Sequence, residues 1–334
     1  MSRLVRLSVV GVAAATLLVL AAGAWLTWFA VQPLDVSDEA RQLQIKKGRS
    51  FSWVADELVR TGVLHEGWTI RILARVLGRA NSVQAGVYRL PERITPYRLL
   101  EMLANGEVTE AQITFIEGWT FAQMRMALAQ HPLVGQETAE LSESELLRRI
   151  GAEERRAEGL FFPDTYNFSP GAPDWKILGH AYATMRSRLE RLWSIRSPDL
   201  PYASPYDALI MASIVEKETS LESERPLIAA VFVNRLKRGM RLQTDPTVIY
   251  GLGTGFDGNL RKRDLEADTP YNTYTRAGLP PTPIAMPGQA ALEAALRPAA
   301  TNHLYFVARG DGSSYFSSNL SEHNAAVRRY QLGR

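Results

Sequence analysis

Residues 204–219 read SPYDALIMASIVEKET, and this stretch predicts a helix that is buried on all sides. Ser204 can cap its start, Pro205 suits the first helical position, and Asp207 occupies the capping-box position. Successive residues rotate by about 100°, so the apolar side chains that follow cover nearly the whole circumference. A helix of this kind belongs in the interior of a domain.

Two acids, Glu216 and Glu218, lie at the C-terminal end of this predicted helix. Burial and the helix dipole both disfavour a carboxylate there, so both pKa values are expected to rise. A general acid at neutral pH needs a raised pKa. The two side chains project about 160° apart and cannot share one task. From the helix alone, either a catalytic acid or structural acids bound to loops or to Arg225 would explain them.

The segments around this helix predict a mixed α+β domain. Apolar residues at helical spacing indicate a helix over about 174–195. The segments 304–308 and 314–316 flank a Gly-rich turn and predict a hairpin, which implies a sheet beside the helices. A change of composition near Ala152 places this larger domain at 152–334. The preceding stretch, 131–158, is expected to be helical and shows no site-like feature.

A strand-turn-helix pattern occurs twice before that boundary. Residues 45–50 (IKKGRS) and 115–120 (FIEGWT) each combine a strand end, a Gly turn and a Ser or Thr helix cap, and apolar residues follow at four-residue spacing. Ile94-Thr95-Pro96 opens a third copy without Gly. Such units resemble the LysM module, a small peptidoglycan-binding βααβ fold. The region 45–151 is therefore expected to be LysM-like, with a generic α+β domain that only orients an enzyme as the alternative.

The N-terminus carries the strongest compositional signal. Arg3 and Arg6 precede an uncharged run, residues 7–31, that is long enough to span a bilayer, and Trp25 and Trp28 lie near its far end. Positive charge before the run predicts a cytoplasmic N-terminus, with the bulk of the chain outside the cytoplasm. Residues 1–31 are thus expected to form a single-pass anchor, followed by a polar connector at 32–44. A signal peptide cleaved at residues 22–24 (AGA) is the alternative.

Composition limits the remaining functions. The chain of 334 residues can form one small and one medium domain beyond the anchor. Its formal net charge of +3 gives no argument for a nucleic-acid partner. It contains no cysteine, which excludes disulfides, thiol nucleophiles and Cys-ligated metals. His303 and His323 are too isolated to indicate ligands, so we predict no metal and no cofactor.

Two long motifs supply a specific resemblance. The segments 211–251 (MASIVEKETSLESERPLIAAVFVNRLKRGMRLQTDPTVIYG) and 269–288 (TPYNTYTRAGLPPTPIAMPG) resemble the signature of the MltG (YceG-like) endolytic murein transglycosylases. The resemblance implies that the second acid of EKET, Glu218, is the catalytic residue. A looser similarity to soluble lytic transglycosylases points the same way, through the order Glu218-Thr219, Gln243, then Tyr271-Asn272.

The resemblance implies a single-carboxylate mechanism. Glu218 would protonate the glycosidic oxygen between N-acetylmuramic acid and N-acetylglucosamine. The substrate's 2-acetamido group can stabilise the cation at C1, so no enzyme nucleophile is needed. Glu218 would then take the proton of the muramic C6 hydroxyl, whose oxygen closes on C1 to give a 1,6-anhydro end.

The other motif residues are expected to form the substrate pocket. They are Gln243, Asp245, Tyr250, Tyr271, Asn272, Thr273 and Tyr274. Amide, hydroxyl and aromatic side chains of this kind can hold acetamido groups and sugar faces. Asp245 is the second candidate for a catalytic role, although it can equally build a turn before Pro246. Each Tyr taken singly can be a half-buried core aromatic.

Two other functions remain open on the sequence. A muramidase would let water attack the same bond, and a wall-binding scaffold would not cleave it. The expected partners are peptidoglycan glycan strands, the membrane and peptidoglycan synthases. The expected location is the bacterial inner membrane with a periplasmic catalytic domain, where termination of nascent strands is the implied task.

Overall fold

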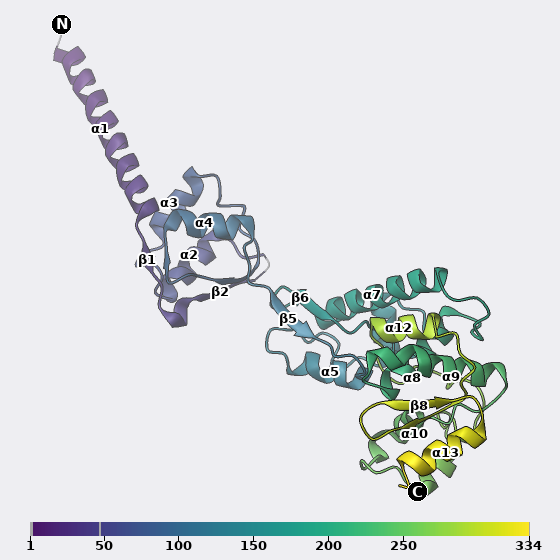
Figure 1. Ribbon diagram of the computed structural model, residues 1–334. Helices are drawn as coiled ribbons and strands as arrows, with labels where there is room; N and C mark the ends of the chain where they lie inside the picture. Colours follow the sequence, from purple (N-terminus) through teal and green to yellow (C-terminus); the bar gives the residue numbers. More distant parts are fainter. Residues whose placement is uncertain (1–2, 47, 334) are drawn as a thin grey trace. The chain divides into compact units, whose positions relative to one another are not determined.

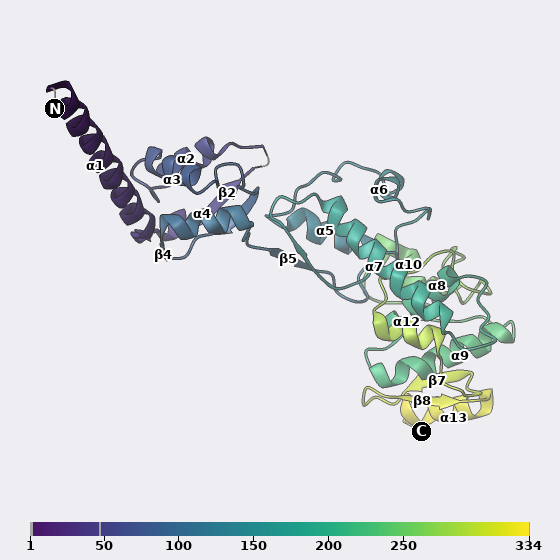
Figure 2. The same cartoon turned by 90° about the horizontal axis from the view of Figure 1, so that it is seen from above.

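The computed structural model describes residues 3–46 and 48–333 and contains two compact units (Figures 1 and 2). Unit 1 comprises Met1–Ala111 and Asn167–Gly171, and unit 2 comprises Gln112–Tyr166 and Ala172–Arg334. The architecture is mixed helix and sheet, as expected, with one N-terminal apolar helix. Within the described residues, every sheet has only two strands.

Unit 1 combines the apolar helix with a small α+β body. Its elements are α1 (Arg3–Val31), β1 (Leu34–Asp35), η1 (Asp38–Ala40), β2 (Gln42–Ile45), α2 (Phe51–Arg60), α3 (Trp68–Val76), β3 (Gly86–Arg89), β4 (Arg93–Ile94) and α4 (Pro96–Asn105). Strands β2 and β3 pair antiparallel, with Gln42 opposite Arg89 and Ile45 opposite Gly86. Strands β1 and β4 form a second antiparallel pair. The order β2-α2-α3-β3 is thus strand, helix, helix, strand.

The predicted helix starts in this region are confirmed. Ser50 accepts a hydrogen bond from the Trp53 backbone N–H at the start of α2, and Thr95 accepts one from Arg98 at the start of α4. These bonds satisfy backbone donors that a helix leaves free in its first turn. The apolar residues at four-residue spacing, among them Leu58 and Leu103, are fully buried in the core.

Unit 2 is mainly helical. Its elements are β5 (Ala111–Thr114), α5 (Phe121–Gln130), α6 (Glu143–Ile150), β6 (Thr165–Phe168), α7 (Asp174–Ser194), α8 (Pro205–Glu218), η2 (Glu222–Glu224), α9 (Arg225–Lys237), α10 (Asp245–Leu252), η3 (Gly253–Gly255), α11 (Lys262–Glu266), α12 (Gln289–Leu296), β7 (Tyr305–Ala308), β8 (Ser314–Ser317) and α13 (Leu320–Tyr330). The chain passes between the units in β5 and β6, which pair with each other. Helix α7 and the β7–β8 hairpin match their predictions, and α9 and α13 pack on the hairpin.

Helix α8 is the centre of unit 2 and confirms the prediction for residues 204–219. Ser204 and Asp207 form a complete capping box at its start. Every residue from Ala208 to Val215 is buried, against α7, α9, α10 and α12. Complete burial of the middle of the helix fixes the position of its C-terminal turn, which carries the two acids.

The compact units divide between Ala111 and Gln112, whereas the sequence placed the change near Ala152. Backbone pairing explains the difference. The Gly118 N–H donates to the Met286 carbonyl at 2.8 Å, and the Met286 N–H donates to the Trp119 carbonyl at 2.7 Å. The second strand-turn-helix copy therefore packs within unit 2, while the first lies in unit 1. In the stretch 131–158, which was expected to be helical, helix is confined to Glu143–Ile150.

Candidate active site

Glu218 is the last residue of α8, and the chain leaves the helix at Thr219 in an extended conformation. The Thr244 hydroxyl donates a hydrogen bond of 2.6 Å to Oε2 of Glu218. Burial raises the pKa of Glu218, the Thr244 bond lowers it, and the nearby Asp245 carboxylate raises it again. The net effect is upward, as expected for a general acid.

The hydroxyl that meets Glu218 is rigidly supported. Thr244 lies at the start of α10, yet its side chain does not cap that helix and is directed to Glu218 instead. Its backbone N–H donates to Oγ1 of Thr273 at 3.1 Å, and Oγ1 of Thr273 lies 2.8 Å from Oγ1 of Thr247. All three threonines are buried. Thr273, predicted as a pocket residue, therefore positions the partner of Glu218 from below the surface.

Gln243 adopts a strained backbone conformation beside this pair. Its φ of 53° lies in the left-handed region, which costs a residue with a Cβ of order 1 kcal/mol. The Gln243 N–H donates to the Thr273 carbonyl at 3.2 Å, while its side chain is exposed. Strain of this kind concentrates at functional sites. It orients the exposed amide of Gln243 and the buried Thr244 in different directions.

Asp245 and Tyr274 form a second pair near Glu218. The Tyr274 hydroxyl donates to Oδ1 of Asp245 at 2.6 Å. Burial raises the pKa of Tyr274, and the charges of Asp245 and Glu218 raise it further. Tyr274 therefore stays protonated and serves as a hydrogen-bond donor.

Arg235 is a charged residue of this region that the sequence did not identify. It lies buried on α9, where Nε donates to the Leu304 carbonyl at 2.7 Å and Nη1 to the Leu242 carbonyl at 2.6 Å. Its positive charge acts on both Glu218 and Tyr274. Arg235 follows the apolar run Leu227–Val233 of α9, but Asn234 and Lys237 beside it are equally polar, so a surface position fits that signal equally well.

Asn272 is fully buried and its amide is bound by protein atoms. Nδ2 donates to the carbonyls of Leu265 at 3.0 Å and Ala267 at 2.6 Å, and Oδ1 accepts from the Tyr274 N–H at 2.8 Å. The side chain thus shapes the loop that carries Tyr271 and Tyr274. The sugar contact expected for Asn272 from the sequence stays a prediction, and these bonds give its amide a role in the shape of the loop.

Tyr250 and Tyr271 pack edge to face, with ring centroids 4.8 Å apart. The Tyr250 hydroxyl donates to Oε2 of Glu158 at 3.1 Å, and the Phe121 N–H donates to Oε1 at 3.0 Å. Burial raises the pKa of Glu158 from 4.5 to about 7. Glu158 therefore stabilises the fold most at acidic pH, and this contribution falls as pH rises towards 7. No sequence pattern indicated that Glu158 is buried, since the residues that precede it are mostly charged.

Glu216 has a different environment from Glu218. Its Oε1 accepts from Nη2 of Arg225 at 3.1 Å, and its Oε2 accepts from the Gly288 N–H at 2.9 Å. Only 5% of the Glu216 side chain and 11% of the Arg225 side chain are exposed, so this is a buried ion pair. The interpretation of a structural acid bound to Arg225 and a loop therefore applies to Glu216.

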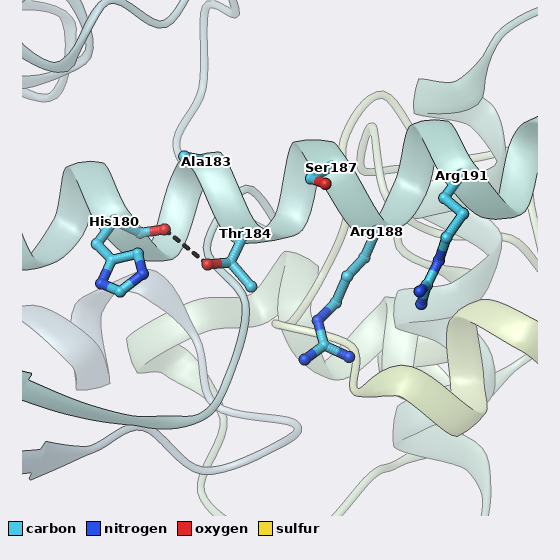
Figure 3. A pocket seen from close by; sticks show the side chains of 6 residues that line it. All are labelled: His180, Ala183, Thr184, Ser187, Arg188 and Arg191. Carbon is cyan, nitrogen blue, oxygen red and sulfur yellow. Dashed lines mark hydrogen bonds between the residues drawn. The ribbon is translucent and has the colours of Figure 1, made fainter.

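A separate polar cavity of about 470 Å³ lies along α7 (Figure 3). Its lining residues are His180, Ala183, Thr184, Ser187, Arg188 and Arg191. Figure 3 shows the Arg188 and Arg191 side chains extending from the same face of the helix. None of the residues predicted from the motifs belongs to this lining. Within residues 3–46 and 48–333, no group of three or more His, Asp or Glu side chains could hold a metal ion.

Comparison with known proteins gives a consistent result. The model of the YceG-like family matches residues 43–329. The endolytic murein transglycosylase of Bacillus subtilis (strain 168) is 34% identical over 306 residues, which cover 86% of this chain and 84% of that protein. The endolytic murein transglycosylase of Streptococcus pneumoniae serotype 2 is 28% identical, and the match covers 88% of this chain but 59% of that longer protein.

A solved structure is also similar. The crystal structure of a YceG-like protein from Listeria monocytogenes superposes with a TM-score of 0.54 and 29% sequence identity, covering 86% of this chain and 99% of that one. The family model, the Bacillus relative and this structure each extend over both compact units. The chain therefore belongs to the YceG-like family.

Proposed function

We propose that this protein is an endolytic murein transglycosylase that cleaves peptidoglycan glycan strands, with Glu218 as its catalytic acid and base. The observation that carries this proposal is the environment of Glu218: a partly buried carboxyl with a raised pKa, held by one hydroxyl donor at the end of a fixed helix. Two similar proteins, from Bacillus subtilis and Streptococcus pneumoniae, carry the same activity in their names.

The geometry suits one carboxyl that performs both proton transfers. Thr244 holds Oε2, which leaves Oε1 to deliver the proton to the glycosidic oxygen. The bond between C1 and that oxygen breaks, and the 2-acetamido group stabilises the cation at C1. The carboxylate then removes the proton of the C6 hydroxyl, and the C6 oxygen bonds to C1. Glu218 ends protonated and ready for the next cut.

The surrounding residues divide into two groups in this proposal. The exposed side chain of Gln243, the Asp245–Tyr274 pair and the rings of Tyr250 and Tyr271 would contact the sugars. Asn272 and Thr273 would act as positioning residues, because their polar atoms contact protein groups.

The other parts of the chain fit an enzyme that works at the cell wall. The strand-helix-helix-strand order of residues 42–89 has the sequence of elements of a LysM module, which supports a glycan-binding role for unit 1. The alternative is a body that only orients the catalytic unit. Helix α1 continues through residues 22–24 without interruption, which supports an uncleaved single-pass anchor in the inner membrane. In that arrangement the catalytic unit is periplasmic, and the polymerases that produce nascent strands are the expected partners.

Mass spectrometry of digested glycan strands tests the proposed reaction. We expect products that end in 1,6-anhydro-N-acetylmuramic acid, because the C6 oxygen replaces water as the nucleophile. Reducing ends without the anhydro product would instead identify a muramidase. Strands that bind but stay intact would identify a scaffold.

The Thr244 hydroxyl provides a test by pH dependence. It stabilises the charged form of Glu218, so Thr244→Val should raise the pKa of that carboxyl. Activity requires protonated Glu218 and is lost as pH rises through this pKa. The alkaline limb of the kcat profile should therefore move up by about one pH unit, since a hydrogen bond to a charged group contributes about 1.5 kcal/mol.

Thr244→Ser is the matched control, because it keeps the hydroxyl and should leave the limb in place. Glu158 also titrates near pH 7, but it is common to all three proteins and cancels in the comparison. An unchanged or downward limb in Thr244→Val would contradict the assigned role of the bond.

A further inference from the structure

Helix α3 exposes an apolar stripe on the face that points away from the core of unit 1. Trp68, Ile72 and Val76 recur at four-residue spacing and are 47%, 40% and 68% exposed. The opposite face of the helix, with Ile70 and Leu73, is buried in the core of unit 1. Single exposed apolar residues are ordinary, but an aligned row of three indicates a surface that meets an apolar medium.

The stripe begins at the end of the apolar helix α1. The indole rings of Trp25 and Trp68 stack at 5.4 Å with their planes 11° apart. The last turns of α1 belong to the same body as α3, because Ala30 is buried in the unit 1 core and Leu26 and Phe29 pack against it. Both views place α3 on the side of unit 1 from which α1 emerges (Figures 1 and 2).

This geometry fixes the height of α3 relative to a bilayer that α1 spans. A span needs about 20 apolar residues, so a span that begins at Leu7 ends near Leu26. Trp25 then lies in the interfacial zone that Trp prefers. Because Trp68 stacks on Trp25, the start of α3 lies in the same zone.

We propose that the Trp68–Ile72–Val76 face of α3 is a second membrane contact, which lies on the outer leaflet beside the point where α1 leaves the bilayer. The inference rests on the single-pass anchor proposed above and adds a lipid-facing surface in the folded body. The exposed guanidinium of Arg75 lies between Ile72 and Val76 in sequence and suits anionic headgroups. Arg71 on the same helix is already paired with Asp56.

The absence of native cysteine makes a direct test possible in the full-length protein. Single substitutions Ile72→Cys and Val76→Cys place a thiol on the stripe. Both positions are exposed, so a label can be attached to the folded protein. Each variant is labelled with an environment-sensitive fluorophore and reconstituted into nanodiscs of phosphatidylcholine and phosphatidylglycerol. Quenching is measured with nitroxide-labelled lipid and, separately, with aqueous iodide.

Two further positions serve as references. Leu18→Cys reports the middle of α1, and Gln44→Cys reports exposed β2, which lies away from α1 in both views (Figures 1 and 2). We expect nitroxide-labelled lipid to quench the labels at 72 and 76 clearly more strongly than the label at position 44. We also expect their iodide quenching to be several-fold weaker than at position 44.

The outcomes separate the two proposals. Lipid quenching at 18 with iodide-accessible labels at 72 and 76 would overturn the α3 contact and leave the anchor intact. Protection of 72 and 76 from both quenchers would also overturn it, since protein rather than lipid would cover the stripe. A label at 18 that escapes lipid quenching would overturn the anchor, and the α3 contact with it.

Discussion

Replacing Glu218 by Gln is expected to reduce turnover of peptidoglycan by about 10²–10⁴-fold, the usual contribution of a general acid-base group. The amide keeps the size of the side chain and can still accept the Thr244 hydrogen bond, but it cannot transfer a proton. The effect should appear in kcat, because the lost interaction is made during the reaction. Release of soluble muropeptides from purified glycan strands measures it.

The thermal midpoint provides the control for this variant. Burial makes the ionised form of Glu218 unfavourable, so a neutral amide at this position should fold with equal or slightly higher stability. Strand binding by sedimentation should also persist. Glu218→Gln protein that folds, binds strands and still cuts them at the native rate would remove Glu218 from the catalytic role.

Replacing Glu216 by Gln is expected to have the opposite profile. The change removes the nearer carboxylate of the buried Arg225 guanidinium and leaves the half-exposed Glu117, whose Oε2 lies 4.0 Å from Nη2, as a weaker partner. The loss should cost about 3 kcal/mol of the free energy of unfolding. The amide still accepts from the Gly288 N–H, so the loss should lie at the lower end for a broken buried pair. A thermal midpoint lowered by roughly 5–10 °C follows for a unit of this size. Turnover per folded molecule should change little.

A double-mutant cycle distinguishes the ion pair from general damage. Arg225→Met alone should also destabilise, whereas the double variant should lose less than the sum of the two, because no unpaired buried charge remains. Unchanged melting with abolished turnover in Glu216→Gln would mean that the roles of the two acids have been assigned the wrong way round.

The sequence predicted the elements whose signals are local. Helix α8 has its capping box, Pro at the first position and a continuous apolar circumference within sixteen consecutive residues, and the structure confirms each. The same holds for the caps at Ser50 and Thr95. Such signals depend only on backbone donors and side chains a few residues apart.

Features that depend on distant partners could not be predicted in this way. Glu158 becomes a buried acid only because Phe121 and Tyr250 lie against it, 37 and 92 residues away in the chain. The buried position of Arg235 depends on carbonyl groups of Leu242 and Leu304 that reach it through the fold. The motif could not show that the Asn272 amide donates to the Ala267 carbonyl of its own loop.

The division of the chain shows the same limit. Two similar strand-turn-helix copies fall in different units, because the second one pairs through Gly118 and Trp119 with Met286, far along the chain. The local pattern of residues determines that each copy forms a strand end, a turn and a helix. The unit to which each copy belongs depends on hydrogen bonds between residues far apart in the chain, which a local sequence pattern does not reveal.

The fusion of α1 with the core of unit 1 has a mechanical consequence. A flexible linker between the anchor and unit 1 would let unit 1 sample a volume that grows with linker length. Here Phe29 and Ala30 of α1 pack in the core of unit 1, so the proposed anchor is connected rigidly to that unit. The wall layer that unit 1 can reach is then set by helix rise and packing. The local concentration of unit 1 at newly made strands is therefore set by this fixed distance from the membrane. The main motion left to unit 1 is diffusion in the plane of the membrane.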